Sequence, residues 1–415
     1  MRADDILLLG IGIQPPWQLV DQHLDTSTAP HELHLQMAAD RGARFPCPEC
    51  GVACPAHDFT EKRWRHLNFF QQHCYITASV PRVRCPEHGV RLVEVPWAHK
   101  GSAFTLLFEQ AALALVREMP VLAAARLMAI TDKRLWRIVH HYVEKAVAGF
   151  DLSGVRGLGL DETASKRGHN YVTVFIDMAR RSEPVIFVTP GRGKDTLPAF
   201  AEFLRSHGGE PGQILEVVCD MSPAFLSGVA EELPNASVTV DWFHIVQVFT
   251  RSVNAVRKLE GKERPLPNHL RWAVLKRGQL GHLTDNQLLA LAEIVDQGLD
   301  AATAWRIKEK LTWVRRAKTP RAARWRITHY LNWAKRLVGE EPRLEPIRRS
   351  LVTLKTHRER VVQRWTSTYT NARLEGFNGL FQAARARARG YRNDVTYMSM
   401  IYLIGSPAGS ILKST

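Results

Sequence analysis

The chain has 415 residues, of which 45% are hydrophobic and 23% are charged, a balance that excludes a disordered chain and predicts roughly two to four globular domains. The formal net charge is +15 and the sequence pI is about 9.8, which indicates a polyanionic partner such as nucleic acid. No apolar run reaches the roughly 18 residues of a membrane span, and the acidic opening before residues 6–9 is unlike a signal peptide, so we expect a cytoplasmic protein without a membrane partner.

The cysteines are too few for a disulfide scaffold, and their spacing indicates a metal site. Cys47 and Cys50 form a Cys-x-x-Cys knuckle, Cys85 and His88 form a Cys-x-x-His knuckle, and each knuckle is followed by glycine. The two bracket the strand-like segment 74–80, as in a zinc ribbon. We therefore expect residues 1–98 to form a zinc-binding domain with these four ligands. The alternative pair within this segment is Cys54 and His57.

Residues 99–150 have the apolar spacing of three helices, with Pro120 opening the second and Thr131 capping the third. A tight turn at residues 129–130 separates the last two, which predicts a helix-turn-helix. The third helix would present its basic residues outward for DNA binding. These residues are Lys133, Arg134 and Arg137. A small helical bundle without DNA contacts fits the same pattern.

A series of β-rich runs follows in residues 151–250, and two of these runs lead into carboxylates. Asp161 closes the apolar stretch 155–160, and Asp220 closes the stretch 214–219. The expected order is three strands, a helix, a strand, a helix and a fifth strand, which is the order of an RNase H-like mixed sheet. Because the first and fourth strands are neighbours in that fold, we expect Asp161 and Asp220 to lie close together.

Residues 251–366 lack strand alternation and are expected to form a large α-helical insertion. They hold 26 Lys and Arg against 11 Asp and Glu, whereas the rest of the chain holds 30 against 30. The basic block therefore carries the whole charge imbalance and should contact phosphates. Its tryptophans are interleaved with arginines and are interpreted first as core residues. They are Trp272, Trp305, Trp313, Trp325, Trp333 and Trp365.

The last segment, residues 367–415, is expected to complete the catalytic domain and to end in a tail. Leu374, Phe377 and Phe381 recur at helical spacing, and Glu375 shares a helix face with Asn378 and Gln382. Two strand ends and one helix can therefore bring Asp161, Asp220 and Glu375 to one point. Three carboxylates are hard oxygen ligands suited to two Mg²⁺ or Mn²⁺ ions, which support phosphodiester chemistry.

Several motifs, in this order along the chain, are specific in combination. They are Arg63-Trp64-Arg65-His66-Leu67, Gly159-Leu160-Asp161-Glu162, Cys219-Asp220-Met221-Ser222-Pro223, Asp241-Trp242-Phe243-His244, Asn371-Ala372-Arg373-Leu374-Glu375-Gly376-Phe377-Asn378 and Arg389-Gly390-Tyr391-Arg392-Asn393. With them the chain resembles the DDE transposases of bacterial insertion sequences, and among these the ISL-three family. The resemblance covers nearly the full length. One departure is the Cys-His pair at the later zinc knuckle, where a second cysteine pair is common.

The resemblance implies an α+β multidomain enzyme that binds the terminal inverted repeats of an insertion sequence. Because joining two ends needs two active sites, we expect a homodimer or a larger assembly on DNA. Its catalytic triad would be Asp161, Asp220 and Glu375, cutting DNA by metal-dependent hydrolysis and joining the 3′-hydroxyl to target DNA by transesterification. It also implies bacterial, nucleoid-associated localisation. Arg389 and Arg392 are expected to hold backbone phosphates.

Two residues after the fifth strand have less defined parts. Asp241 is the main rival of Asp220 for the second acidic position. His244 would contact the scissile phosphate or a flipped base, or would make a structural hydrogen bond. Two other functions remain open: a DNA-binding regulator with an inactive nuclease-like domain, and an RNase H-like nuclease without strand transfer.

Overall fold

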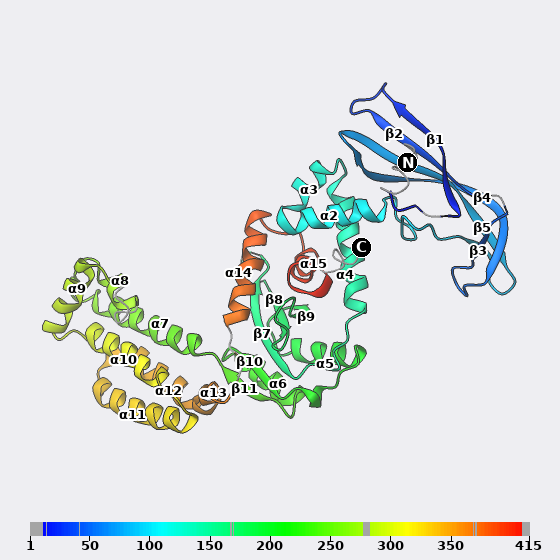
Figure 1. The fold of residues 1–415 in the computed structure, drawn as a ribbon. Coiled ribbons are helices and arrows are strands. Elements are labelled where there is room, and N and C mark those ends of the chain that lie inside the picture. Colours follow the sequence, from blue (N-terminus) through cyan, green and yellow to red (C-terminus); the bar gives the residue numbers. More distant parts are fainter. Residues whose placement is uncertain are drawn as a thin grey trace. The chain divides into compact units, whose positions relative to one another are not determined.

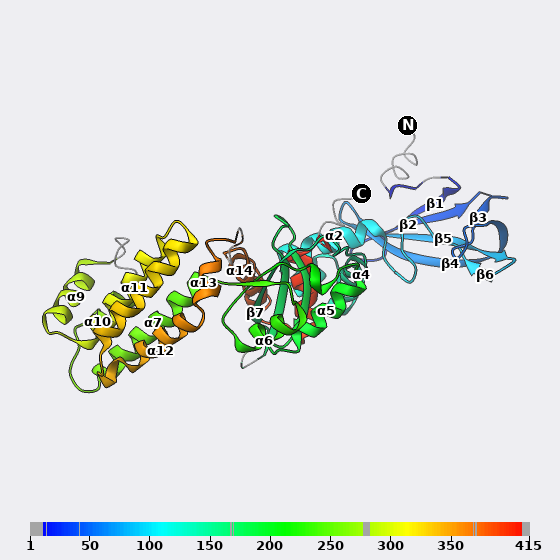
Figure 2. The same ribbon diagram turned by 90° about the horizontal axis from the view of Figure 1, so that it is seen from below.

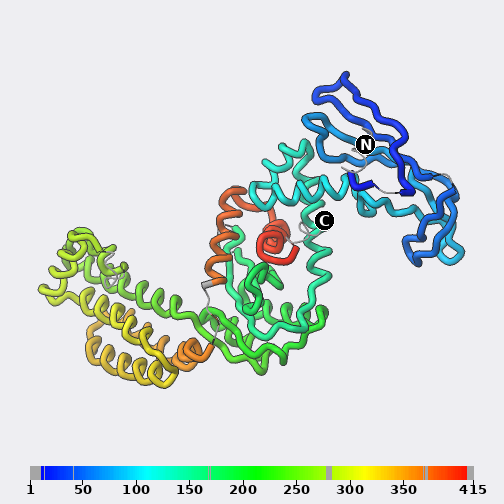
Figure 3. Tube along the Cα trace, in the orientation of Figure 1, coloured from blue at the N-terminus to red at the C-terminus, as the bar shows by residue number. Residues whose placement is uncertain are grey.

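The computed structural model describes residues 11–13, 15–40, 42–166, 168, 170–276, 283–367, 369 and 372–408, with the side chain of Ala372 left aside. The opening segment considered above as a signal peptide and the motif residue Asn371 lie outside these residues. The chain divides into two compact units, the first ending at His141 and the second running from Tyr142 to Ile411. Figure 3 traces the chain from end to end.

The first unit contains a six-stranded sheet in the order β1-β2-β5-β4-β3, with β6 paired to β5. Its strands are β1 (Trp17–Asp25), β2 (Glu32–Ala39), β3 (Arg44–Pro46), β4 (Ala53–Phe69), β5 (Gln72–Cys85) and β6 (Gly89–Leu92). β4 and β5 form a long antiparallel hairpin, which brings the Cys47 knuckle near the Cys85 knuckle. Trp17, Trp64 and Trp97 pack edge to face in its core, with centroids 4.9 and 5.7 Å apart.

Three helices complete the first unit: α2 (Leu106–Glu118), α3 (Val121–Leu127) and α4 (Asp132–Ala148), the last of which runs on past His141. The turn between α3 and α4 contains Ala129 at φ +51°, in the left-handed region. On α4, Leu135, Ile138 and Val139 are buried. The three helices and the tight turn confirm the predicted helical pattern.

The second unit is built on a five-stranded sheet in the order β11-β10-β7-β8-β9. Its strands are β7 (Gly157–Ala164), β8 (Tyr171–Asp177), β9 (Val185–Pro190), β10 (Glu216–Cys219) and β11 (Ser237–Val240). The pairs β7·β8 and β8·β9 are antiparallel, whereas β10 is parallel to both β7 and β11. This is the RNase H-like mixed sheet expected from the sequence, with the first and fourth strands as neighbours.

Helices pack around this sheet (Figure 1). They are α5 (Thr196–Ser206), α6 (Pro223–Glu232), α14 (Ala372–Arg387) and α15 (Asp394–Gly405), with a 3-10 turn at Pro211–Gln213. Phe200 on α5 stacks on Phe175 of β8 with centroids 4.7 Å apart. Residues 367–415, expected to complete this domain and to end in a tail, include α15. Its Tyr402 hydroxyl accepts a hydrogen bond from the Val188 N–H on β9 (2.9 Å).

Between β11 and α14 the chain forms an all-helical bundle (Figure 2). Its helices are α7 (Trp242–Glu260), α8 (Leu270–Leu275), α9 (Asp285–Asp296), α10 (Asp300–Arg315), α11 (Pro320–Val338), α12 (Glu345–Thr356) and α13 (Arg358–Gln363), with a 3-10 turn at Pro342–Leu344. One hydrophobic cluster joins these helices, with Tyr330 fully buried inside it. The bundle already begins with α7, so this helix runs across the boundary predicted at residue 251.

Most tryptophans of the bundle pack partly buried against its core, including Trp305, Trp313, Trp333 and Trp365. Trp272 and Trp325 are instead 53% and 55% exposed. The interpretation as core residues therefore holds for four of the six and fails for these two. Within the described residues, no helix has the length and apolar character needed to cross a membrane.

Candidate active site and zinc centre

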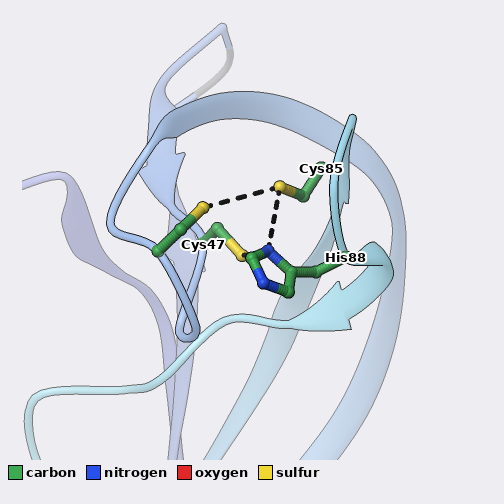
Figure 4. A group of neighbouring side chains, drawn as sticks. Cys47, Cys85 and His88 are labelled. Carbon is green, nitrogen blue, oxygen red and sulfur yellow. Dashed lines mark hydrogen bonds between the residues drawn. The ribbon is translucent and has the colours of Figure 1, made fainter.

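The two knuckles of the first unit bring Cys47, Cys50, Cys85 and His88 together, with all ligand atoms within 4.8 Å of one another. The Cys50 and Cys85 sulfurs are 3.6 Å apart, and the Cys85 sulfur lies 3.6 Å from Nδ1 of His88. Ligands about 2.3 Å from a tetrahedral zinc lie roughly 3.8 Å apart, so the donor set fits zinc. In Figure 4 the ring of His88 points toward the sulfur atoms of Cys47 and Cys85.

The alternative pair stays outside this group. Cys54 is buried and its thiol donates to the carbonyl of Val52 (3.5 Å), while Nε2 of His57 lies 3.3 Å from Arg84 on the neighbouring strand. Across the residues that the structure covers, the four knuckle side chains form the one group of three or more His, Cys, Asp and Glu close enough to share an ion. The geometry therefore agrees with the predicted ligands.

In the second unit, Asp161 lies within β7 and not at its end. The strand continues to Ala164 because Asp161 pairs with Val174 of β8, whereas the pairing with β10 stops at Gly159. Asp161 therefore stands just beyond the point where β10 ends. Asp220 directly follows β10, so the two carboxylates occupy the same edge of the sheet.

Helix α14 runs along β7 (Figures 1 and 3), and its polar side chains bond to the strand. Asn378 Nδ2 donates to Oδ2 of Asp161 (2.8 Å). One turn further, Gln382 Nε2 donates to Thr163 Oγ1 (2.6 Å) and to the Ala164 carbonyl (3.0 Å). Glu375 lies one turn before Asn378 on the same face, which agrees with the predicted grouping of these three side chains.

Close packing of α14 requires a small residue on β7. A Cβ atom on Gly159 would lie 2.9 Å from Cδ1 of Leu374 and 2.7 Å from the sulfur of Met178. Gly159, Asp161 and Thr163 alternate along one face of the strand. The glycine thus lets the helix that carries Glu375 approach the strand that carries Asp161.

Burial raises the pKa of Asp161 to about 6. The neighbouring Asp220 adds to this shift, while the Glu162 N–H that donates to Asp161 Oδ1 (2.8 Å) and the charge of His244 act against it. Partial burial and the charge of Asp241 raise the pKa of Glu375, and His244 again opposes the shift. Asp161 and Asp220 therefore repel one another in the absence of a cation, whereas the carboxylate that acts on Glu375 is that of Asp241. Within the described residues, the structure does not bring Asp161, Asp220 and Glu375 close enough together to share one ion.

Asp241 and His244 lie beside this cluster. Asp241 caps α7 by accepting from the Phe243 N–H (2.9 Å) and is 3.9 Å from Arg364. Asp220 likewise accepts from the Ser222 N–H (2.8 Å), so capping does not distinguish the two acids.

Two buried polar atoms here, Nε2 of His244 and Oδ1 of Asn378, have no hydrogen-bond partner among the described residues. An unpaired buried polar atom is costly. Such atoms at an acidic cluster fit a site that completes its bonding with a cation, water or phosphate.

Comparison with known proteins decides the family. A family model described as a transposase matches residues 158–401, a helix-turn-helix domain of transposase family ISL3 matches residues 93–143, and a zinc finger of the transposases of IS204, IS1001, IS1096 and IS1165 matches residues 43–88. The first match alone covers more than half of the chain. The chain belongs to the ISL3 family of transposases.

Two curated relatives extend this result. The transposase for insertion sequence element IS1557 of Mycobacterium tuberculosis is 30% identical over 217 residues, which are 51% of this chain and 48% of that protein. The transposase for IS1001 of Bordetella parapertussis is 25% identical over 358 residues, covering 84% of this chain and 85% of that protein. The match thus spans about half the length of the first relative and most of the second.

In this family member, the basic residues predicted to bind DNA fall in two places. Lys133, Arg134 and Arg137 are exposed on α4, within the segment that matches the helix-turn-helix model. Arg389 follows α14 and lines a cavity there, whereas Arg392 is exposed and does not line that cavity.

Sequence reasoning missed two contributors to the site, Gly159 and the interaction of Asn378 with Asp161. Glycine at alternate positions of the strand, Gly157 and Gly159, is the signal that indicates a close approach.

Proposed function

We propose that this ISL3-family protein cleaves DNA at the terminal inverted repeats of an insertion sequence and joins the freed 3′-hydroxyl to target DNA. The supporting observation is the side-by-side placement of β7, β10 and α14. With it, Asp161 and Asp220 share a sheet edge, and Asn378, one turn from Glu375, bonds to Asp161. Membership of a transposase family and relatives named as transposases point to the same activity.

Asp161, Asp220 and Glu375 would hold Mg²⁺ or Mn²⁺, which supplies charge neutralisation at the phosphate and acidifies the attacking water or hydroxyl. The donor set fits such ions because it consists of carboxylate oxygens, and a cation would relieve the repulsion between Asp161 and Asp220. The chain orients these ligands in advance. Asp161 is held at both oxygens, by the Glu162 N–H and by the Asn378 amide, so little reorganisation accompanies the reaction.

His244 would donate from Nε2 to an oxygen of the scissile phosphate, since this atom is buried at the acidic cluster and has no partner within the described part of the chain. A neutral or protonated imidazole at that place would stabilise negative charge on the phosphate during exchange of its oxygen ligands.

The DNA-binding role divides among the modules. Lys133, Arg134 and Arg137 on α4 would contact the DNA end, as the exposed face of the second helix of a helix-turn-helix does. The zinc centre would hold the knuckles of the first unit in place. Because joining two ends needs two active sites, we propose at least a homodimer on DNA, acting on the bacterial nucleoid in the cytoplasm.

A strand-cleavage and strand-transfer assay tests the proposal. The DNA is a labelled duplex carrying the inverted repeat that flanks the gene, with Mg²⁺ and a plasmid target. Wild-type protein should nick the end and join it to the plasmid. Asp161→Asn, Asp220→Asn and Glu375→Gln should each lower cleavage by at least about a hundredfold, whereas Glu202→Gln, an exposed acid on α5, should not.

Each other outcome excludes a part of the proposal. Cleavage without joining would leave an RNase H-like nuclease, and binding without cleavage would leave a DNA-binding regulator. Near-normal nicking by Asp220→Asn together with loss in Asp241→Asn would transfer the second acidic position to Asp241.

A further inference from the structure

A basic cavity lies at the end of α14 remote from Glu375. Its volume is about 740 Å³, and its lining includes Ser165, Lys166, Gln382, Arg385, Arg389 and Tyr391. The cavity is open to solvent, and its residues come from the chain just after β7, from the C-terminal end of α14 and from the turn that follows it. Of its lining residues, Arg389 is already expected to hold a backbone phosphate, but no role has been given to the cavity itself.

Among the described residues, three cations and no carboxylate line this cavity. Among the residues that the structure places, Lys166, Arg385 and Arg389 form no ion pair with Asp or Glu, and Arg385 donates only to the side-chain oxygen of Gln382 (2.8 Å). Positive charge concentrated without internal neutralisation favours an anionic ligand.

The cavity also contains an unsatisfied buried donor. Ser165 is 2% exposed, and within the described residues its hydroxyl has no hydrogen-bond partner. A buried hydroxyl without a hydrogen-bond partner is energetically unfavourable. Together with the three cations it forms the donor set of a phosphate-binding site, in which a hydroxyl and guanidinium groups share the phosphate oxygens.

The backbone directs Arg389 into this place. Arg389 and Gly390 both have positive φ, +56° and +98°, and the Gly390 N–H donates to the Arg385 carbonyl (2.9 Å), which ends the helix in a left-handed turn. The chain therefore folds back over the last turn of α14. This brings the Arg389 side chain beside that of Arg385.

One face of α14 carries both the acid and an arginine. Glu375, Asn378, Gln382 and Arg385 succeed one another at intervals of three or four residues, and Arg389 follows in the turn after the helix. Asn378 bonds to Asp161 and Gln382 to Thr163, so helix and strand advance together in the same direction. The next positions in this series are Arg385 on the helix and Ser165, which directly follows β7.

The separation of cavity and acids follows from this register. From Asp161 to Ser165 the extended chain advances about 13 Å, and from Glu375 to Arg385 the helix rises about 15 Å. Along duplex DNA, phosphates of one strand are spaced about 3.4 Å apart along the axis. This span corresponds to roughly four nucleotides.

We propose that this cavity seats one backbone phosphate of the transposon-end DNA, roughly four nucleotides from the phosphodiester that is cut. The inference rests on the proposed function, because it takes the acidic cluster as the place of cleavage. Ser165, Lys166, Arg385 and Arg389 bind this phosphate, and the contact fixes the register of the strand relative to the acids. A backbone phosphate carries no base identity, so this contact fixes position and not sequence.

Methylphosphonate interference tests the proposal. Full-length protein is bound to a series of end duplexes, each with one neutral methylphosphonate at a successive position from the cleavage site, which wild-type cleavage in Mg²⁺ maps first. For wild type, affinity should fall roughly tenfold at one position near the fourth nucleotide, a loss typical of a charge-assisted contact.

Substitutions in the cavity should remove that sensitivity. Arg389→Ala and Arg385→Ala should each weaken binding to unmodified DNA by a similar factor. In these variants the methylphosphonate near the fourth position should cause no further loss of affinity, because the substitution and the methylphosphonate remove the same contact. Ser165→Ala should give a smaller loss with the same indifference. The control is Arg205→Ala, an exposed arginine at the end of α5, which should keep the wild-type pattern.

An interference pattern in Arg389→Ala and Arg385→Ala identical to that of wild type would overturn the phosphate seat while leaving the proposed function standing. The absence of binding and cleavage in wild type with every duplex would instead overturn the proposed function, and this inference with it. Thermal melting of each variant checks that the fold is intact. Because Arg389 is exposed, Arg389→Ala should melt at the same temperature as wild type.

Discussion

Both carboxylate oxygens of Asp161 accept hydrogen bonds from other groups of the chain, yet ionisation of this carboxyl group is unfavourable. The Glu162 N–H and the Asn378 amide each donate to it at 2.8 Å, while burial raises its pKa to about 6. Ionised Asp161 therefore lowers the stability of the folded protein, while its fixed position suits it to bind a metal. Such a loss of stability is common at functional sites. A cation at Asp161 would relieve this cost.

The sign of this effect gives a pH-dependent prediction. Because the folded pKa of Asp161 is raised from 3.8 to about 6, this group contributes stability below about pH 4 that is lost as pH rises through 6. Asp161→Asn should therefore stabilise the metal-free protein at pH 7.5, by about 1–3 kcal/mol, and less at pH 5. Thermal melting at both pH values in EDTA measures this. An Asn variant that melts below wild type at pH 7.5 would contradict the electrostatic argument.

The zinc ligands can be separated from their neighbours one side chain at a time. Cys50→Ser should lower bound zinc to a small fraction of one ion per chain and destabilise the first unit, because structural zinc contributes directly to folding. Cys54→Ala should retain zinc, since Cys54 lies outside the ligand group. Elemental analysis of purified protein measures the metal content. Retention of zinc in the Cys50 variant, or its loss in the Cys54 variant, would reassign the centre.

At the scale of elements, the contact between β7 and α14 decides whether the acids can act together. Gly159 leaves no room for a methyl group beside Leu374 and Met178, whereas a Cβ on Gly379, within α14 itself, would meet nothing within 4 Å. The two glycines thus offer a matched pair of alanine substitutions. One alters the contact between helix and strand, and the other leaves it alone.

Gly159→Ala should push α14 away from β7, at a cost of about 1–3 kcal/mol for overpacking. Cleavage should fall roughly a hundredfold, as expected for a displacement near 1 Å at an active site. Gly379→Ala should leave cleavage unchanged and stabilise the helix by about 0.5–1 kcal/mol. Cleavage rates and melting curves of both variants check this. Equal cleavage by the two would show that the approach of α14 does not govern the site.

The strand order and the helix face of Glu375 could be predicted because apolar residues recur with clear periods in both. The extension of β7 beyond Asp161 could not, since Asp-Glu-Thr-Ala favours no strand by itself and is extended only by its pairing with β8. Most of the sheet of the first unit was not predicted from the sequence, because charged residues along β4 obscure the apolar alternation typical of a strand. Helix α15 was missed although Asn393 caps it and Tyr397, Met400 and Ile401 form its buried side.

For the whole molecule, the charge is uneven in a way that the fold explains. The helical bundle has a large hydrophobic core of its own, and most of its described Lys and Arg side chains lie on the surface, with Lys308 a buried exception. Exposed Trp272 lies beneath Arg271, with the guanidinium carbon 4.9 Å from the ring centroid. A basic surface with accessible aromatic rings is typical of proteins that contact nucleic acid.

This surface predicts a steep dependence of DNA affinity on salt. Replacing three exposed cations of α11, Arg321, Lys335 and Arg336, by alanine should reduce the slope of log affinity against log salt by about 1–3. Fluorescence anisotropy from 50 to 300 mM KCl, an interval chosen around roughly 0.15 M physiological salt, measures the slope. Arg205→Ala serves as the control, and an unchanged slope in the triple variant would exclude α11 from the DNA contact.

The most direct measurement of the account is a titration with Mn²⁺, followed by electron paramagnetic resonance, of zinc-replete wild type and of the variants Asp161→Asn, Asp220→Asn and Glu375→Gln. If the carboxylates of β7, β10 and α14 share a site, wild type should bind about two ions per chain, and each variant should bind fewer or bind them at least about tenfold more weakly, whereas Glu202→Gln should match wild type. Equal Mn²⁺ binding by wild type and all three variants would contradict the claim that Asp161, Asp220 and Glu375 form one metal site.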